Sequence, residues 1–339
     1  MAYITLNKKY FFNNLDIIAQ RSKGKDKIAL VLKDNAYGHG LLQIATMARE
    51  YGIKKAVVRS FREAKAIEAY FEYILVLADT PKVASTKIRY TINDLSAIGD
   101  FAQGSKVELK VNTGMNRNGI EVDEVERAFE LIDKQGLILE AIFTHHSCAD
   151  EDLCIFEEQN RIFDELKKRV KVLEKGYNFQ NIAFHSCNSA ALFETEDFEE
   201  DMVRVGIAAY GCLELDHNED VAKLQPILSL YAKKNSQRHV KVGGCIGYGA
   251  SHEIKEPCIV TNYDFGYGDG FLRACSNAYV TPEGAQLLGR ISMDNSSFLS
   301  DKQELLIFND ARVVAKVANT ISYEILTSLK PHLERKILD

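Results

Sequence analysis

A lysine followed by closely spaced polar residues and glycines is the stretch of this sequence best suited to chemistry. Lys33 follows the apolar run at residues 28–32 and opens the segment Lys-Asp-Asn-Ala-Tyr-Gly-His-Gly, which closes at Gly40. The apolar run predicts a buried strand, so the amine at its end is held rigidly and is partly shielded from water. Burial favours a neutral lysine, and a fixed neutral amine is what Schiff-base chemistry with an aldehyde requires.

These eight residues resemble the signature of the alanine racemase family, whose members use pyridoxal 5'-phosphate to interconvert L-alanine and D-alanine. The resemblance implies that Lys33 carries the cofactor and acts as the base on the D face of the substrate. It also implies that Tyr37 binds the cofactor phosphate. D-alanine made in this way would supply peptidoglycan for the cell wall.

Composition sets the class of protein. The 339 residues favour two domains, and 46% hydrophobic with 27% charged residues is typical of a soluble globular chain. A net charge of −6 disfavours binding to nucleic acid or to an anionic membrane. No apolar stretch is long enough for a membrane span and the start lacks a signal peptide, so we expect a cytoplasmic protein. Seven scattered cysteines predict reduced thiols and no metal site.

Strand and helix patterns alternate through the first two thirds of the chain. Strands are expected near residues 28–32, 55–58, 74–77, 107–111, 137–143, 182–184 and 203–205, with helices at 62–71, 122–134 and 153–172. Repeated strand–helix units predict a parallel sheet, and seven strands with an eighth easily missed favour a closed (β/α)8 barrel. The first strand is not followed by GxGxxG, which weakens a Rossmann interpretation.

The pattern changes near residue 225. Strand-like segments at 227–232, 258–263 and 286–291 alternate with glycine-rich turns, and helical patterns return at 311–318 and 323–329. We therefore predict a barrel at residues 1–225 and a mainly β domain at 226–339. The family resemblance implies the same plan, in which about the first eight residues can join the second domain.

Functional groups of such a barrel gather at the carboxyl ends of its strands. Residues 110–119 follow a predicted strand and resemble the family element KxDTGMxRxG. The resemblance implies that Arg117 contacts the phenolic oxygen of the cofactor and the substrate carboxylate, a role that suits its planar fork of donors. It also implies that Lys110 can be carbamylated and then orients Arg117. Asn112 stands where the family has aspartate.

Two further elements in the barrel resemble the family. Residues 144–150 resemble THFxxAD, which implies that His145 packs beside the pyridine ring, and His146 stands where the family has phenylalanine. In HxxNSAA, Asn188 and Ser189 are implied to bind the cofactor, and a helix expected to begin at Ala190 exposes N–H groups to an anion.

Residues 204–207 resemble the family element RxGI. The resemblance implies that Gly206 and Ile207 bind the phosphate through their N–H groups and that Arg204 faces the pyridine nitrogen. Arginine stays protonated and accepts no hydrogen bond, so it disfavours a protonated pyridine. The cofactor then becomes a weaker electron sink, which favours proton return over transamination and therefore fits a racemase.

Inversion needs a second base on the opposite face of the substrate. Tyr248 lies in a segment that resembles the family's SYG element, with Gly247 in place of serine, and is implied to be that base on the L face. A phenol with a reference pKa near 10 needs help from its surroundings to do so. Met293 lies in GRxxMD and is implied to bind the substrate carboxylate through its backbone.

The last matched elements line the pocket. The segment around Tyr267 resembles GYADGYxR, whose tyrosine and arginine, here Tyr267 and Arg273, line the corridor through which substrate enters. Gly268 and Phe271 depart from that pattern. Tyr323 lies in the match to GTINYE and is implied to bind phosphate and to narrow the pocket.

The resemblance implies a head-to-tail homodimer in which Tyr248 and Met293 complete the site of the partner, with a small amino acid as substrate. Four alternatives stay open: a racemase for serine or lysine, a non-catalytic pyridoxal-phosphate carrier, a decarboxylase, and a barrel without cofactor. Tyr248 and Met293 argue against the carrier, and Arg204 argues against the decarboxylase, which usually has an acid there. The end of the chain, residues 331–337, matches the family least well.

Overall fold

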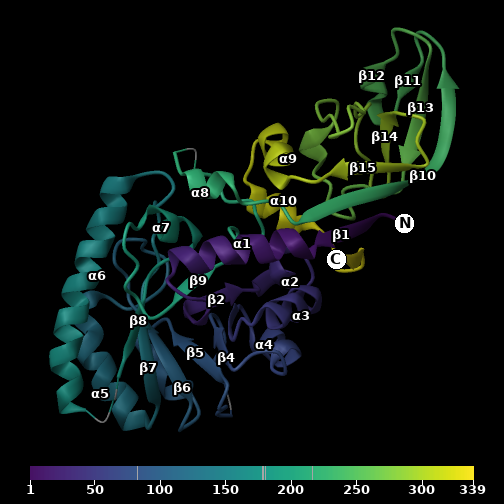
Figure 1. The fold of residues 1–339 in the computed structure, drawn as a ribbon. Coiled ribbons are helices and arrows are strands. Elements are labelled where there is room, and N and C mark those ends of the chain that lie inside the picture. Colours follow the sequence, from purple (N-terminus) through teal and green to yellow (C-terminus); the bar gives the residue numbers. More distant parts are fainter. Residues whose placement is uncertain (82, 178, 180, 216) are drawn as a thin grey trace.

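The computed structural model describes residues 1–339 except 82, 178, 180 and 216, and it shows a parallel barrel beside a second, mainly β region (Figure 1). The barrel order is β8-β7-β6-β5-β4-β3-β2-β9. The strands are β2 (Ile28–Val31), β3 (Lys55–Val58), β4 (Tyr73–Val76), β5 (Ile88–Ile92), β6 (Lys106–Lys110), β7 (Ile138–Phe143), β8 (Ala183–His185) and β9 (Val203–Val205). Backbone hydrogen bonds from Asp201 to Phe184 (3.2 Å) and from Arg204 to Cys187 (3.0 Å) join the β8 and β9 segments. The predicted (β/α)8 class is confirmed.

Helices cover the outside of the barrel. They are α1 (Lys8–Arg21), α3 (Leu41–Tyr51), α4 (Phe61–Ile67), α5 (Val125–Gln135), α6 (Leu153–Leu173), α7 (Ser189–Glu194) and the short α8 (Glu219–Ala222). In α5 the buried residues Val125, Ala128, Phe129 and Ile132 recur at helical spacing and form the face that packs on the sheet. Because helices cover its outer face and the barrel interior covers its inner face, β2 is buried at all four positions.

The second sheet has the order β14-β13-β10-β1-β16, and β15 also pairs with β10. Its elements are β1 (Tyr3–Asn7), β10 (Leu228–Val240), β13 (Cys258–Tyr263), β14 (Ser296–Leu299), β15 (Glu304–Phe308), β16 (Glu334–Leu338), the hairpin β11 (Cys245–Ile246) and β12 (His252–Glu253), and the helices α9 (Ala311–Ala318) and α10 (Ser322–Ser328). β1 runs antiparallel to β10 and parallel to β16. The first strand of the chain therefore belongs to the sheet formed by the last third. The division at residue 225 stays a proposal.

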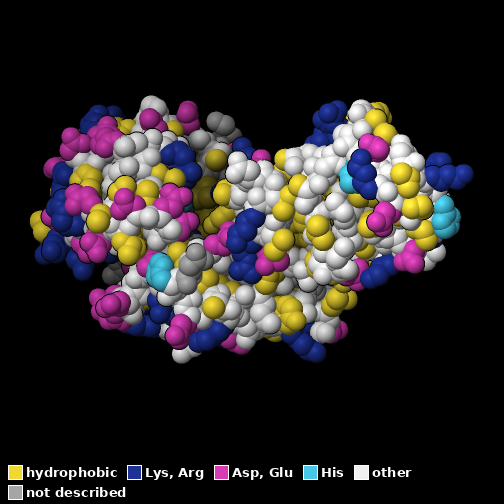
Figure 2. Space-filling model, turned by 90° about the horizontal axis from the view of Figure 1, so that it is seen from above, with side chains coloured by type: hydrophobic (Ala, Val, Ile, Leu, Met, Phe, Trp, Pro, Cys, Tyr) yellow, Lys and Arg dark blue, Asp and Glu magenta, His cyan; other side chains and the backbone are white. Residues whose placement is uncertain are grey.

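One expected strand is wrong. Residues 286–291 do not form a strand, because Gln286 and Leu287 make only isolated bridges and Gly289 turns the chain at a φ of 75°. One hydrophobic core runs from the barrel into the second sheet, and a separate small cluster around Ile246 and Leu288 supports the region of the β11–β12 hairpin. Seen from above, the surface has two lobes with a hollow between them (Figure 2). No helix in the described part of the chain is long and apolar enough to cross a membrane.

Candidate active site

The predicted cationic residues meet at one end of the barrel. Lys33 follows β2, Lys110 ends β6, and Arg204 lies in β9, and parallel strands bring these carboxyl ends to the same edge. Burial, followed by the charges of Arg117, Arg204 and Lys33, lowers the pKa of Lys110 to about 8. The charges of Lys33, Arg117 and Arg204 therefore act on Lys110 at this end of the barrel, which suits an anionic ligand.

Lys33 leads into an unusual backbone turn, α2 (Lys33–Tyr37). The four residues after Lys33 all have positive φ values, from 52° to 57°, although none is glycine. Left-handed helical backbone costs roughly 1–2 kcal/mol per L-residue, so the surroundings must hold this turn. The N–H of Asp34 donates to Glu63 (2.8 Å), and the side chain of Asn35 accepts from the N–H of Leu41 (2.9 Å).

Tyr37 ends the turn beside the backbone of Gly206. A Cβ built on Gly206 would lie 2.8 Å from the Tyr37 hydroxyl oxygen, so only glycine allows this approach. The Tyr37 ring packs against Tyr210 and Tyr323, at 5.3 and 5.8 Å between centroids. No described residue hydrogen-bonds the Tyr37 hydroxyl, although the side chain is only 8% exposed. The phenol is therefore ready to donate to a ligand.

Ser189 completes the polar cluster near Gly206. Its hydroxyl accepts from the N–H groups of Gly206 (3.1 Å) and Ala208 (3.3 Å) and lies at the start of α7. Asn188 caps the same helix through a hydrogen bond from Ala191 (2.9 Å), so its side-chain oxygen is used inside the protein. Ile207 follows Gly206 and is buried. The hydroxyls of Tyr37 and Ser189 thus lie beside the backbone of Gly206, where phosphate binding was predicted, and the Gly206 N–H itself is used by Ser189.

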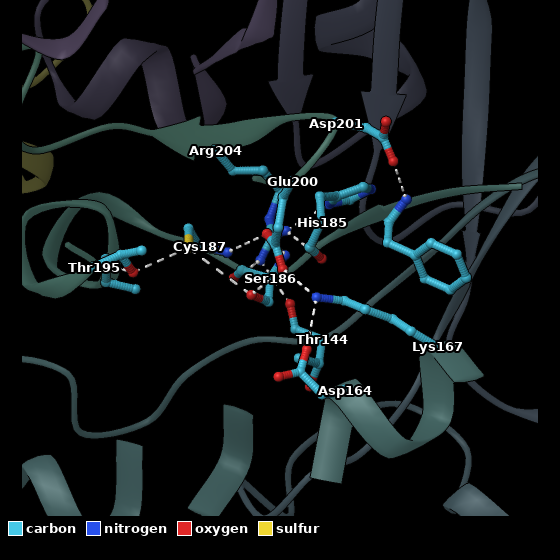
Figure 3. Close-up of polar contacts among 12 residues, drawn as sticks. Thr144, Asp164, Lys167, His185, Ser186, Cys187, Thr195, Glu200, Asp201 and Arg204 are labelled. Atoms are coloured by element: carbon cyan, nitrogen blue, oxygen red, sulfur yellow. Dashed lines mark hydrogen bonds and ion pairs between the residues drawn. The ribbon is translucent and has the colours of Figure 1, made fainter. Parts of the chain in front are cut away.

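Arg204 is 5% exposed and is fixed by backbone oxygens (Figure 3). Its guanidinium donates to the carbonyls of Thr144 (2.6 Å), Ser186 (2.9 Å) and His185 (3.1 Å) and lies over the ring of Phe143 at 5.0 Å. Burial lowers the pKa of Arg204. The positive charge is thus held rigidly among carbonyl oxygens that accept its hydrogen bonds.

A buried chain of side chains continues from Arg204 into the barrel. Arg204 Nη1 donates to His185 Nδ1 (2.5 Å), which leaves the His185 Nε2–H to donate to Glu108 (2.9 Å). The Tyr73 hydroxyl donates to the other oxygen of Glu108, which is fully buried. Burial lowers the pKa of His185, so the imidazole is neutral between a cation and a carboxylate. We did not predict Glu108, His185 or Tyr73 as site residues.

His145 follows β7 and approaches Arg204, with 3.4 Å between Nδ1 and Nη2. Burial, and next the charge of Arg204, holds the pKa of His145 well below its usual value. The neighbouring His146 packs edge-on against Phe156, and neither of its ring nitrogens has a partner among the described residues. His146 thus occupies the apolar position where the family has phenylalanine.

Arg117 is carried by an exposed loop that Asn112 organises. The side-chain oxygen of Asn112 accepts from the N–H groups of Gly114 (3.1 Å) and Asn116 (3.0 Å), and its amide donates to Glu121 (2.9 Å). An aspartate could accept the two backbone hydrogen bonds, but only asparagine can also donate one to Glu121.

The remaining predicted residues lie on the second region and are exposed. Tyr248 is 68% and Met293 is 56% exposed, and Tyr267 and Arg273 are also exposed. The N–H of Gly268 donates to the carbonyl of Met293 (2.8 Å), and a Cβ on Gly268 would lie 3.0 Å from that oxygen, a tight contact. β11 and β12, which flank Tyr248, lie at the far end of the second sheet from the barrel (Figure 1). One chain does not bring Tyr248 to Lys33.

No group of three or more candidate metal ligands occurs in the described part of the chain. The family model for the N-terminal domain of alanine racemase matches residues 6–214, and that for the C-terminal domain matches residues 227–337. A protein named alanine racemase from a Nitratiruptor species is 44% identical over 339 residues and covers 100% of both chains. One from Campylobacter curvus is 39% identical over 340 residues, again with 100% coverage of both.

The fold of the chain is also similar to solved structures of alanine racemases. The alanine racemase of Clostridium difficile 630 has a TM-score of 0.89 and 26% identity, with 99% of this chain and 95% of that chain covered. The alanine racemase of Bacillus anthracis, solved with bound L-Ala-P, has a TM-score of 0.86 and 25% identity, with 100% and 95% covered.

Proposed function

The chain belongs to the alanine racemase family of pyridoxal-phosphate-dependent isomerases, and we propose that it interconverts L-alanine and D-alanine with Lys33 and Tyr248 as the two acid–base groups. The observation that carries the assignment of roles is the turn at Lys33, where an amine, a free phenol and a bare glycine backbone meet beside Arg204.

The residues fit pyridoxal 5'-phosphate. The hydroxyl of Tyr37 bonds to no described residue and lies beside the backbone of Gly206, and together with the hydroxyl of Ser189 it suits a phosphate group. Lys33 would hold the aldehyde end, and Arg204 would lie at the pyridine nitrogen. Tyr323 would join Tyr37 at the phosphate. When bound, the cofactor withdraws electrons from the substrate and makes its α hydrogen acidic.

Proton transfer needs one group on each face of the substrate. The amine of Lys33 takes or returns the proton on the D face, and the phenol of Tyr248 does so on the L face. Arg117 and the backbone of Met293 hold the substrate carboxylate, and neutral His145 packs against the cofactor ring. Arg204 keeps the pyridine nitrogen unprotonated, which favours return of the proton to carbon over side reactions.

A head-to-tail homodimer would complete the site. Tyr248, Met293, Tyr267 and Arg273 are exposed and lie on the second region, and the N–H of Tyr267 donates to the carbonyl of Ser292 (3.0 Å), next to Met293. In the proposed dimer these residues cover the barrel mouth of the partner and form the substrate corridor. We place the enzyme in the cytoplasm and its product in peptidoglycan synthesis, and we propose a carbamate on Lys110, whose lowered pKa favours the reactive neutral amine.

Exchange of the α hydrogen in heavy water tests the two roles separately. Tyr248→Phe should still exchange the α hydrogen of D-alanine through Lys33, but exchange of L-alanine and racemisation should fall about 10²–10⁴-fold. Lys33→Ala should lose both exchanges and the yellow colour, and borohydride should no longer fix the cofactor to the peptide that contains residue 33.

Tyr10→Phe is the matched control, because Tyr10 is an exposed tyrosine of α1. It should behave as wild type. Racemisation at the wild-type rate by Tyr248→Phe would overturn the assignment of the second base.

A further inference from the structure

The left-handed turn after Lys33 is fastened from the other end of the chain. Arg335, in β16, places its guanidinium on the carbonyl oxygen of Gly38, with hydrogen bonds from Nε (3.0 Å) and Nη2 (2.8 Å). The remaining N–H groups donate to the carbonyls of Lys330 (3.1 Å), Pro331 (3.2 Å) and Leu333 (2.5 Å). All five guanidinium donors are therefore used on backbone oxygens, which the fixed fork of arginine allows and a lysine amine does not.

The glycines of the turn make room for this contact. A Cβ on Gly38 would lie 1.9 Å from the carbonyl oxygen of Leu326 in α10, and one on Gly40 would lie 2.7 Å from Arg335 Cδ. Both glycines also have positive φ values, 77° and 102°. The turn is thus pressed between α10 and the side chain of Arg335, and a larger residue at either glycine would separate them.

The segment that carries Arg335 is itself fixed. The N–H of Lys330 donates to the carbonyl of Asp269 (3.1 Å), and His332 Nε2 bonds the carboxylate of Asp269 (2.9 Å). In β16, Arg335 pairs with Ile4 of β1. Residues 330–335 therefore connect the predicted substrate corridor at Tyr267 to the turn beside Lys33.

We propose that Arg335 is a positioning residue of the active site: it holds the carbonyl of Gly38 and thereby fixes the turn that aims Lys33 and Tyr37. The proposal rests on the roles proposed above for those two residues. Without this contact, the strained turn between β2 and Gly38 relaxes, and the Tyr37 hydroxyl loses its fixed position opposite Gly206. By linkage, a bound cofactor must in return stabilise the Arg335 contact.

Hydrogen exchange tests the contact with and without cofactor. The N–H groups of Gly38, His39 and Gly40 bond to the carbonyls of Asp34, Ala36 and Asn35 inside the turn, so their exchange reports on it. Arg335→Met should speed exchange of the peptide that contains residues 33–41 about tenfold or more in the cofactor-free protein. It should also speed cofactor dissociation about tenfold, and bound cofactor should no longer slow exchange in β16. Arg335→Lys should fall between, and it keeps the test valid if Arg335→Met does not fold.

Lys336→Gln is the matched control, since Lys336 is the next residue of β16 and contacts Glu334 and Tyr3 on the surface. Exchange in Arg335→Lys and Arg335→Met that equals this control overturns the proposal. So does faster exchange with unchanged cofactor dissociation, which leaves Arg335 a purely structural role. A wild-type chain that never binds the cofactor overturns the proposed function instead, and exchange in the cofactor-free protein still tests the contact at Gly38.

Discussion

The two halves of the proposed site are built in opposite ways. On the barrel, Arg204 is 5% and Lys110 is 9% exposed, and Arg204 has fixed hydrogen-bond partners. On the second region, Tyr248 is 68% and Met293 is 56% exposed. A cation buried in a barrel must be held by its own chain, because desolvation penalises any misplaced charge. Exposed residues with predicted catalytic roles indicate a surface that a second molecule covers.

The barrel residues are therefore pre-organised by their own chain, and the exposed residues of the second region are not. In the proposed dimer, the barrel half would bind cofactor and hold its charges within one chain, whereas the second half would act on the other copy. Stability and assembly are therefore separate requirements for activity, and they can be tested apart.

Mixing two inactive variants tests most directly whether Lys33 and Tyr248 of different chains form one site. Lys33→Ala and Tyr248→Phe dimers should each be inactive, because each lacks one acid–base group at both sites. After subunit exchange, half of the dimers are mixed and each has one intact site, so activity should return to about a quarter of wild type. Racemisation assays before and after mixing measure this, and native mass spectrometry should verify the exchange.

If both groups came from one chain, mixing would restore nothing. The comparison would then fail, because a barrel and second domain of the same chain would have to meet by a movement that the structure does not show.

Apolar patterns in the sequence predict much of the fold. The errors of that prediction have physical causes. β5 (Ile88–Ile92) was missed because Arg89 and Thr91 interrupt the apolar run. In β6, Lys106, Glu108 and Lys110 alternate with apolar residues, which is typical of a strand with one face in water. Here Glu108 is fully buried instead. Alternation shows that residues share a face, but not that the polar face lines the barrel.

The candidate site shows the same limit. Motif spacing located Lys33, Tyr37 and Arg204, since the ends of parallel strands converge. The left-handed turn had only a weak local signal in Asp34 and Asn35, because Tyr37 does not favour positive φ and contacts from distant segments hold it. Arg335 lies in the part of the sequence that matches the family least, and only its tertiary contact with Gly38 shows its use.

Glu108→Gln tests whether the negative charge of Glu108 matters to the buried half of the site. Glutamine can still accept the proton of His185 Nε2, so this change removes the charge that balances Arg204 while it keeps the hydrogen bond. We expect kcat to fall about tenfold with little change in KM. The charge of Glu108 raises the pKa of His185 against burial, so its removal should lower that pKa further. ¹⁵N NMR of His185 across pH measures the shift.

Glu140→Gln is the control, because Glu140 is a barrel glutamate paired with Arg89 and Lys106 rather than with the site. Equal effects of the two substitutions would show that Glu108 contributes only to packing.

Substitution of Lys110 should have the smallest effect of these changes. The sign of its effect on the pH dependence of stability follows from the pKa of Lys110. That pKa is lowered from 10.5 to about 8, chiefly by burial, so above pH 8 the folded chain loses a proton that the unfolded chain keeps. Stability should therefore rise between pH 8 and 10.5 relative to Lys110→Met, in carbon-dioxide-free buffer.

The same neutral amine can attack carbon dioxide, forming a nitrogen–carbon bond and releasing a proton, which leaves a carboxylate near Arg117 and Arg204. Removal of carbon dioxide at pH 8 should then lower activity roughly two- to fivefold, the effect of one charged hydrogen bond that orients Arg117. Bicarbonate should restore it, and ¹³C-labelled bicarbonate should give a carbamate signal that Lys110→Met lacks. Lys106→Met, on the same strand but paired with Glu140, should respond as wild type. A chain that is indifferent to carbon dioxide and shows no signal has a free Lys110, and Arg117 must then be oriented by the loop around Asn112 alone.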